Sequence, residues 1–348
     1  MSSCFVASDP VLPATLLPAT VLDAALGRGH EPQRLLAGTR LFPEDLLSSE
    51  RALSTAQFVR MLANLERQDG GRDTFFRLGA LAMPAAFGPL APLFASARTA
   101  NDALRALLVY RRLCLPFLHL RTIRCDDACW LLLDDAGGAA GVWRPVAETV
   151  GALLVELFRS LDGARPEATW VFTHREPAHV EQYHETFGLR IVFDAPVTAV
   201  RFPRAWLERP LPGRSEVRWR IARRACATAR AGTDPGPGFV EAVRTHLLRC
   251  PRREAALVPC AERFAMSPAT FKRRLREHGV RFQALADRVA LERTLEMLLL
   301  RGLAPDDAIR MLGYSDPSNF RRAFKRWTGR RPLELVAQAR RALEPHGA

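Results

Sequence analysis

The sequence contains almost no lysine. Of its 50 basic residues, only Lys272 and Lys325 are lysine, and all the others are arginine. Abundant arginine, alanine, leucine, glycine and proline are typical of a coding sequence with a high GC content. The number of arginines therefore indicates no function by itself, and each arginine must be judged by its position in the chain.

Long apolar segments are also missing. No apolar run approaches the roughly 20 residues that a helix needs to cross a bilayer. The first residues lack the basic start of a signal peptide and are interrupted by Pro10, Pro13 and Pro18. We therefore expect a cytoplasmic protein that does not have a membrane as a partner.

The cysteines lack the spacing of a metal site. Cys125 and Cys129 lie close together, but no second pair of cysteines or histidines is near enough to complete a zinc site. His174, His179 and His184 recur at a spacing that does not place them on one helix face. We expect no metal, no cofactor and no catalytic residues.

Positive charge is concentrated in the last third of the chain. The formal net charge of the 348 residues is +13. Residues 240–348 contain 22 Lys and Arg against 12 Asp and Glu, so this segment carries +10 of that charge. Such a local charge is typical of a protein that binds a polyanion. A basic surface that serves only solubility is the alternative.

Before this basic segment, the apolar pattern predicts an α+β domain. Residues 1–20 are expected to be disordered or loosely attached, and residues 19–113 have mainly helical spacing. The elements expected after them are strands at 117–123, 129–133, 169–173, 189–193 and 199–202, and helices at 142–161 and 178–187. This order suggests a sheet with helices on one side.

A connection follows the expected sheet domain. Arg214 to Arg230 is expected to form a helix, and residues 231–238 alternate glycine and proline without apolar periodicity. We place the domain boundary there. The chain is thus divided into residues 20–205, a connection at 206–239 and an all-α domain at 240–343.

The all-α segment begins with a helix-turn-helix pattern. Ser267 is expected to cap a helix that starts at Pro268, with Phe271 and Leu275 facing inward. The early residues of such a helix reach base edges in the major groove of B-DNA. We predict base contacts for Arg273, Lys272 and Ala269, and phosphate contacts for Arg274 and Arg276. A solvated surface position without a role is the alternative for Arg273.

A second helix-turn-helix pattern follows. Ser315 is expected to cap its helix, with Pro317 in the first turn. The inward stripe consists of Phe320, Ala323, Phe324 and Trp327. Because asparagine can read adenine and arginine can read guanine, we predict base contacts for Ser318, Asn319, Arg321 and Arg322. Phosphate contacts are predicted for Lys325, Arg326, Arg330 and Arg331.

Residues 282–300 are expected to form the helix that joins the two patterns. At about 1.5 Å per residue this helix spans roughly 28 Å, close to the length of about 34 Å of one turn of B-DNA. One chain could therefore place two recognition helices in successive major grooves, and its site would not need to be palindromic.

The C-terminal segment resembles the DNA-binding domain of AraC/XylS-type bacterial transcription regulators. The resemblance covers about residues 240–343 and is carried by Met266-Ser267-Pro268, Phe271, Arg273-Arg274-Leu275, Gly279, Phe282, the run from Leu312 to Gly329, and Pro332. The N-terminal part resembles the ligand-sensing, arabinose-binding-like domain of a subgroup of these regulators. That match is carried by Phe87-Gly88, Leu90, Ser96, Thr99, Ala103-Leu104-Arg105, His174, Pro177, Phe187-Gly188, Val192-Phe193, Leu207 and Pro210-Leu211.

The resemblance implies an activator, or a dual regulator, whose N-terminal domain senses a small molecule. It also implies promoter DNA and RNA polymerase as partners, and it allows a homodimer formed through the N-terminal domain. It does not indicate the effector or the residues that bind it.

Several positions depart from the family pattern. Ala265 stands at the turn glycine of the first unit, and Ala290 replaces a common arginine of the joining helix. Pro259 stands where a helical residue is usual. We therefore expect the first helix of the first unit to start late or to be distorted.

Two other classes of protein share parts of this pattern. An architectural DNA-binding protein would bind with little sequence preference, whereas polar residues early on two helices favour base readout. A DNA-repair alkyltransferase joins the same module to a catalytic cysteine, but the chain lacks a Pro-Cys-His-Arg-like motif.

Overall fold

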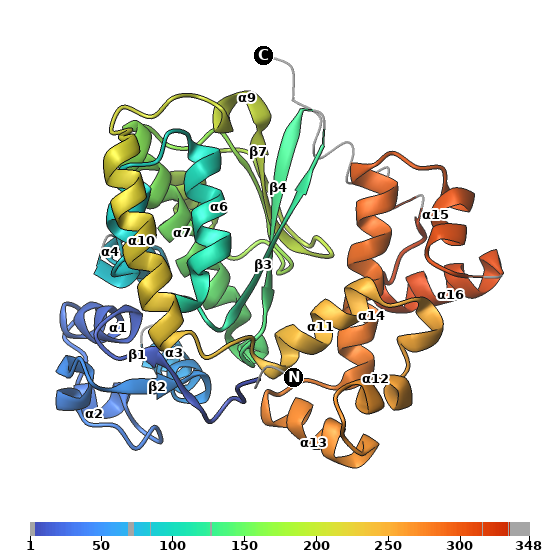
Figure 1. Ribbon diagram of the computed structural model, residues 1–348, viewed down its shortest axis with the longest axis horizontal. Helices are drawn as coiled ribbons and strands as arrows, with labels where there is room; N and C mark the ends of the chain where they lie inside the picture. Colours follow the sequence, from blue (N-terminus) through green and yellow to red (C-terminus); the bar gives the residue numbers. More distant parts are fainter. Residues whose placement is uncertain are drawn as a thin grey trace.

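A computed structural model describes residues 4–68, 73–83, 85–125, 127–314, 316–332 and 334. Its first part is α+β and its last part is helical, as the sequence predicts. Figure 1 shows the two parts side by side, with the sheet near the middle of the molecule. Within the described residues, no helix is long and apolar enough to cross a membrane.

The chain up to residue 113 is mainly helical, which confirms the prediction. Its helices are α1 (Leu17–Leu26), α2 (Pro32–Leu35), α3 (Thr55–Gln68), α4 (Thr74–Leu81), α5 (Leu90–Ala95) and α6 (Ala100–Tyr110), with 3-10 turns η1 (Pro43–Leu47), η2 (Ala85–Phe87) and η3 (Arg111–Leu113). Strands β1 (Pro10–Pro13) and β2 (Ala52–Ser54) pair antiparallel. The inward side chains of these elements, such as Phe58 and Leu65, form the main apolar core.

The chain from Cys4 onward is firmly packed, so the prediction of a loose N-terminal segment is wrong for the residues that the structure describes. The backbone of Phe5 bonds to that of Pro237 and Phe239, and its side chain is only 4% exposed. Cys4 and Val6 pack against the core of the C-terminal part. The segment is ordered because its apolar side chains are buried against both parts of the chain.

The sheet domain follows the predicted order of strands and helices. Within the described residues its strands lie in the order β3-β4-β7-β5-β6, and only β5 and β6 pair parallel. The strands are β3 (Leu118–Arg124), β4 (Ala128–Asp135), β5 (Thr169–Val171), β6 (Ile191–Val192) and β7 (Thr198–Pro203). The other elements are η4 (Ala140–Val142), α7 (Trp143–Asp162), α8 (Val180–Phe187) and α9 (Arg204–Leu207). Gly188 ends α8 as expected.

The two faces of the sheet have different partners. Leu118 and Leu120 of β3 join the main core, whereas His119 and Arg121 alternate with them and belong to the opposite face. Trp130 lies in a small apolar cluster on that opposite face. Helices α6, α7 and α10 lie on one side of the sheet in Figure 1, and the C-terminal helices lie on the other. The second face is therefore the surface on which the C-terminal part docks.

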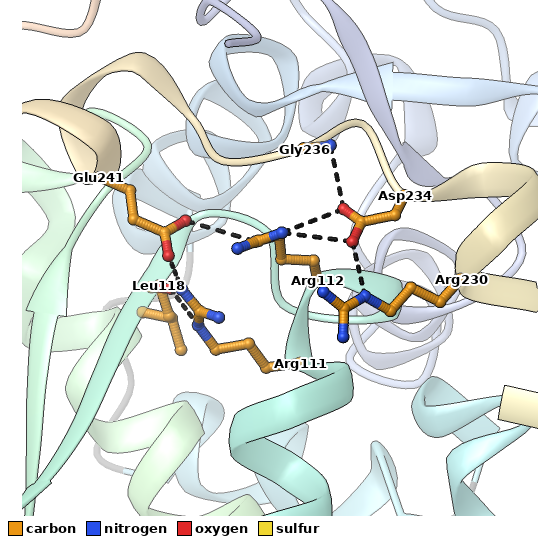
Figure 2. Close-up of polar contacts among 7 residues, drawn as sticks. All are labelled: Arg111, Arg112, Leu118, Arg230, Asp234, Gly236 and Glu241. Atoms are coloured by element: carbon orange, nitrogen blue, oxygen red, sulfur yellow. Dashed lines mark hydrogen bonds and ion pairs between the residues drawn. The ribbon is translucent and has the colours of Figure 1, made fainter. Parts of the chain in front are cut away.

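The predicted helix of the connection is present as α10 (Glu216–Thr233), and α11 (Phe239–Arg249) follows the glycine- and proline-rich segment. Figure 2 shows how that segment is held. Asp234 accepts a hydrogen bond from Arg112 at 3.2 Å, and the buried Glu241 of α11 pairs with the buried Arg111. The segment is pinned on both sides to η3, although its composition suggests a free linker.

The C-terminal part has two small apolar cores that share one helix. Its elements are η5 (Arg252–Glu254), α12 (Leu257–Arg263), α13 (Pro268–Glu277), α14 (Phe282–Leu295), the π-type turn η6 (Glu296–Leu300), α15 (Pro305–Met311) and α16 (Pro317–Thr328). Helix α14 contributes Val289 to the core around Phe271 and Leu291 to the core around Phe320. The predicted joining helix at 282–300 is therefore present, with its last turn widened. The domain bounds 20–205, 206–239 and 240–343 remain predictions, and residues 335–343 lie outside the described part.

We predict that Gly79→Ala destabilises the N-terminal part. A Cβ at Gly79 of α4 would lie 2.2 Å from the carbonyl oxygen of Thr149 and 2.7 Å from the Cβ of Ala152, both in α7. Overpacking of this kind costs about 1–3 kcal/mol. Gly232→Ala in α10 is the matched control, since a Cβ there meets no atom within 4 Å, and it should stabilise the protein by about 0.4–1 kcal/mol. Urea unfolding followed by circular dichroism measures both changes, and equal stability of the two variants contradicts the close packing of α4 on α7.

Candidate nucleic-acid interface

The first helix-turn-helix unit has the predicted cap and core. The Ser267 hydroxyl accepts from the backbone N–H of Thr270 at 3.2 Å, and α13 begins at Pro268. Phe271 and Leu275 are fully buried. Helix α12 is short and begins at Leu257, so that Pro259 lies in its first turn, where no intrahelical N–H bond is lost. This start agrees with the predicted effect of Pro259.

The turn of this unit has the left-handed backbone conformation that favours glycine, although alanine occupies the position. Ala265 has a φ of 54°, in the left-handed region where an L side chain is strained by roughly 1–2 kcal/mol. The surrounding bonds hold it there, since its N–H donates to Glu262 and the next N–H, of Met266, donates to Ala261. The replacement of glycine by alanine therefore strains the backbone at Ala265 but does not change the conformation of the turn.

The outer face of α13 contains the residues predicted to contact bases. Ala269, Lys272 and Arg273 are exposed, as is Arg276. Arg273 pairs with Glu277 on the same face. Arg274 is only half-buried and its guanidinium lies 5.9 Å from the centre of the Phe239 ring, so part of this side chain covers the core.

The second unit has the predicted core but a different cap. Phe320, Ala323 and Phe324 are buried and Trp327 is half-buried, in line with the prediction. The cap of α16 is Asp316, whose carboxylate accepts from the backbone N–H of Ser318 at 2.8 Å. The prediction that Ser315 is the cap is therefore wrong, and Ser315 itself lies outside the described residues.

The residues of α16 predicted to contact bases also lie on its outer face. Ser318, Asn319, Arg321 and Arg322 are exposed. The guanidinium of Arg322 donates to the amide oxygen of Asn319 at 2.6 Å, which leaves the amide N–H groups of Asn319 available as donors. Two polar groups of the outer face are thus held in one arrangement.

The residues predicted to contact phosphates differ in their exposure and in their ion-pair partners. Lys325 and Arg331 are exposed. Arg326 pairs with Asp287 of α14 at 2.8 Å, and Arg330 pairs with Asp194 of the sheet domain at 2.7 Å. Both of these arginines would have to leave or share a carboxylate in order to meet a phosphate.

The two units are held in a defined relation to one another. Helix α14 runs between them (Figure 1), and the Asp287–Arg326 pair ties it to α16. The guanidinium of Arg252, next to α12, lies 3.5 Å from the centre of the Tyr314 ring in the turn of the second unit. These contacts make the two recognition helices parts of one body.

Comparison with known proteins agrees with this geometry. The family model for the arabinose-binding domain of AraC transcription regulators, N-terminal, matches residues 29–211, and a helix-turn-helix domain model matches residues 260–338. The chain belongs to the AraC family of transcription regulators.

Two relatives match most of the chain, and one solved structure is similar to it. The chain is 28% identical to the ornithine utilization regulator of Pseudomonas aeruginosa, over 90% of this chain and 93% of that protein. It is 24% identical to the HTH-type transcriptional regulator VirS of Mycobacterium tuberculosis, over 82% and 84% of the two chains. The crystal structure of the transcriptional regulator CdpR from Pseudomonas aeruginosa is 18% identical and covers 91% of this chain and 96% of its own, with a TM-score of 0.47.

Both recognition helices of this regulator end against the sheet domain. A Cβ added to Gly138, just after β4, would lie 2.7 Å from the carbonyl oxygen of His278, which follows α13. Arg330, which follows α16, pairs with Asp194. The N-terminal part therefore contacts both units at the ends that lie away from their predicted base-reading residues.

The sheet domain contains a buried polar cluster that was not predicted from the sequence. The Tyr183 hydroxyl donates to the Glu148 carboxylate at 2.5 Å and lies 2.8 Å from Nε2 of His174, while His179 lies 3.4 Å from the same carboxylate. Burial raises the pKa of Glu148 and lowers the pKa of His174 to about 4. The helical spacing of the histidines did not reveal this cluster because a loop brings His174 to α8, whereas His184 is exposed and lies apart. Glu148, which interrupts the apolar run of α7, could have indicated a buried polar cluster.

We predict that Ala265→Gly stabilises the protein by about 0.5–1 kcal/mol, because glycine removes the left-handed strain while the unfolded chain gains some freedom. Ala284→Gly, at an exposed position of α14, is the matched control and should destabilise by about 0.5–1 kcal/mol. Urea unfolding of both variants gives the comparison. A loss of stability in both would show that Ala265 is not strained.

Proposed function

We propose that this regulator reads DNA sequence through both recognition helices, α13 and α16, placed in successive major grooves. The observation that supports this most is the matched build of the two helices. Each is capped at its start and buries an apolar stripe that contains phenylalanine. Each also exposes its predicted base-contacting residues, with at least one arginine among them, in its first two turns. Helix α14 separates them within one body, as a reader of two blocks requires.

The proposed roles of the residues follow from their positions. Base contacts are assigned to Ala269, Lys272, Arg273, Ser318, Asn319, Arg321 and Arg322, and phosphate contacts to Arg274, Arg276, Lys325, Arg326, Arg330 and Arg331. Among the second group, Arg276, Lys325 and Arg331 are exposed in the present arrangement. Arg326 and Arg330 would contribute once their carboxylate partners release them, so DNA binding and domain docking would compete for these two side chains.

We further propose that a small molecule controls this reading, and that the outcome is activation through RNA polymerase. The match of residues 29–211 to the arabinose-binding domain supports a sensing role for the N-terminal part. The Pseudomonas relative is a regulator of ornithine utilization, which supports a metabolite as the signal. A ligand can act only if it binds the docked and undocked arrangements with different affinity.

A homodimer through the N-terminal part belongs to the same proposal. We favour a regulator over a repair enzyme because the named relatives are regulators of transcription.

Base contacts and phosphate contacts predict different effects of substitution. Arg273→Ala and Arg322→Ala should each weaken binding to the specific site by about 1–3 kcal/mol and relax base preference at one position. Arg276→Ala and Lys325→Ala should weaken specific and random DNA alike and lower the salt slope by about one. Fluorescence anisotropy at several salt concentrations measures both effects.

Arg220→Ala is the control for the loss of one positive charge, because Arg220 is exposed on α10 and pairs with Glu216 at 2.8 Å, outside the C-terminal part. It should leave DNA affinity almost unchanged. If Arg273→Ala and Arg322→Ala reduce specific and random binding equally, these residues are phosphate contacts and the assignment of base readout is wrong.

In vitro selection of genomic fragments by the full chain tests the two-block reading itself. We expect enrichment of two blocks about 10 base pairs apart, and the genes beside the enriched sites would indicate the metabolite. Enrichment of a single block would show that one unit does not read bases. Salt-sensitive binding without enrichment, with and without candidate effectors, would favour an architectural DNA-binding protein.

A further inference from the structure

A cleft of about 760 Å³ separates the second face of the sheet from the C-terminal helices. Its volume lies within the range of small-molecule sites in proteins. One wall contains His119, His174 and Trp143 of the sheet domain, and the other contains Arg288 of α14 and Trp327 of α16. Both parts of the chain would therefore contact the same bound molecule.

The cleft contains a buried imidazole without a partner. His119 is 8% exposed, and within the part of the chain that the structure describes neither of its ring nitrogens has a hydrogen-bond partner. Burial, and then the positive charges of Arg244, Arg111 and Arg121, hold its pKa well below the usual range. The ring is neutral and offers one donor and one acceptor. A buried polar group left unsatisfied is costly, so this position favours occupation by a polar ligand.

Two further groups on the cleft walls lack partners among the described residues, and they have opposite hydrogen-bond roles. The Tyr183 hydroxyl donates to Glu148 and therefore accepts from Nε2–H of His174. This leaves Nδ1 of His174 as an acceptor without a donor. The indole N–H of Trp327 is buried and is a donor without an acceptor. A ligand that satisfies both groups must carry a donor and an acceptor.

The charges of the cleft are balanced. Among the described residues its lining contains five arginines and five carboxylates, which are Arg144, Arg244, Arg288, Arg326, Arg330, Asp134, Asp135, Asp194, Asp287 and Glu292. Several of them pair across the two parts, as Arg288 does with Asp134 at 2.6 Å. A ligand with a single charge would leave one of these groups unpaired, whereas a ligand with both signs can replace one ion pair by two.

We propose that this cleft is the effector site and that it takes a small zwitterion of the amino-acid class, whose ammonium group faces His119, His174 and the carboxylates while its carboxylate faces Trp327 and the arginines. The inference rests on the proposed control by a small molecule and names its site and ligand class. The ligand exchanges partners with the Asp134–Arg288 and Asp194–Arg330 pairs. Its binding therefore changes how the two recognition helices are held.

The test uses the full chain without DNA, so that its outcome is independent of sequence reading. The probes are the standard L-amino acids and L-ornithine, with succinate, putrescine and L-arabinose as an anion, a cation and a neutral polyol. Thermal shift and isothermal titration calorimetry report binding. We expect at least one amino acid to bind and the three comparison compounds to fail.

His119→Leu is the decisive variant, because it removes an unsatisfied polar group from a buried position and should keep or raise the melting temperature. We expect it to weaken amino-acid binding about ten- to a hundredfold. His278→Leu is the matched control. His278 is 1% exposed and, among the described residues, its ring nitrogens also lack partners, but it does not line this cleft. Its substitution should leave ligand affinity unchanged.

Four results would overturn the proposal. Failure of every amino acid to bind contradicts the ligand class, as does binding of succinate, putrescine or arabinose in their place. Unchanged amino-acid affinity in His119→Leu contradicts the site. An equal loss of affinity in His278→Leu shows a general effect of imidazole removal. Each of these can occur while sequence-specific DNA binding is intact, so failure of this inference is distinct from failure of the proposed function.

Discussion

The buried guanidinium of Arg244 joins the two parts of the regulator. It is 3% exposed and pairs with Asp134 of the sheet and with Glu292 of α14. Glu292 also accepts from Arg121 of β3 at 2.6 Å. Loss of one member of a buried ion pair leaves the other charge buried without a partner and costs about 3–5 kcal/mol. The contributions of these side chains to stability therefore depend on one another. We call this set of ion pairs (Arg121, Asp134, Arg244 and Glu292) the seam. Because α14 lies between the two helix-turn-helix units, the seam determines where the two recognition helices lie relative to the sensing domain.

Around Arg244 the contact between the two parts is ionic, although each part has an apolar interior and Cys4, Val6 and Val197 add apolar contacts elsewhere. Leu118 and Leu120 of β3 enter the main core, while Arg121 on the other face of the same strand meets Glu292. Opening an apolar interface would expose a hydrophobic surface prone to aggregation, whereas charges that separate regain their hydration. The ion pairs in this part of the boundary therefore suit the opening and closing that the proposed control requires, and the same charges provide the cleft with both signs for a ligand.

Local features could be predicted from the sequence and long-range ones could not. Ser267 and Phe271 were predicted correctly because caps and helical stripes depend on residues three or four positions apart. The cap at Asp316 could have been found by the same rule, since proline at the first helical position places the cap directly before Pro317. By contrast, alternation along β3 shows that His119 and Arg121 share a face, but it does not say what covers it. The burial of Phe5 likewise depends on a contact with Phe239, more than two hundred residues away.

In the proposed mechanism, base reading is separate from control because of where the sensing domain contacts the two recognition helices. It contacts α13 and α16 near their C-terminal ends, through Gly138 against His278 and through the Asp194–Arg330 pair, whereas the base-reading candidates lie in the first turns of each helix. A change in the seam can therefore move or release the two helices without altering the side chains that face the bases. In the proposed mechanism the coupling between ligand and DNA is reciprocal: DNA that drew Arg330 away from Asp194 would change ligand affinity by the same factor by which the ligand changes DNA affinity. The sequence preference of the regulator would be the same in both states, and only its affinity would change.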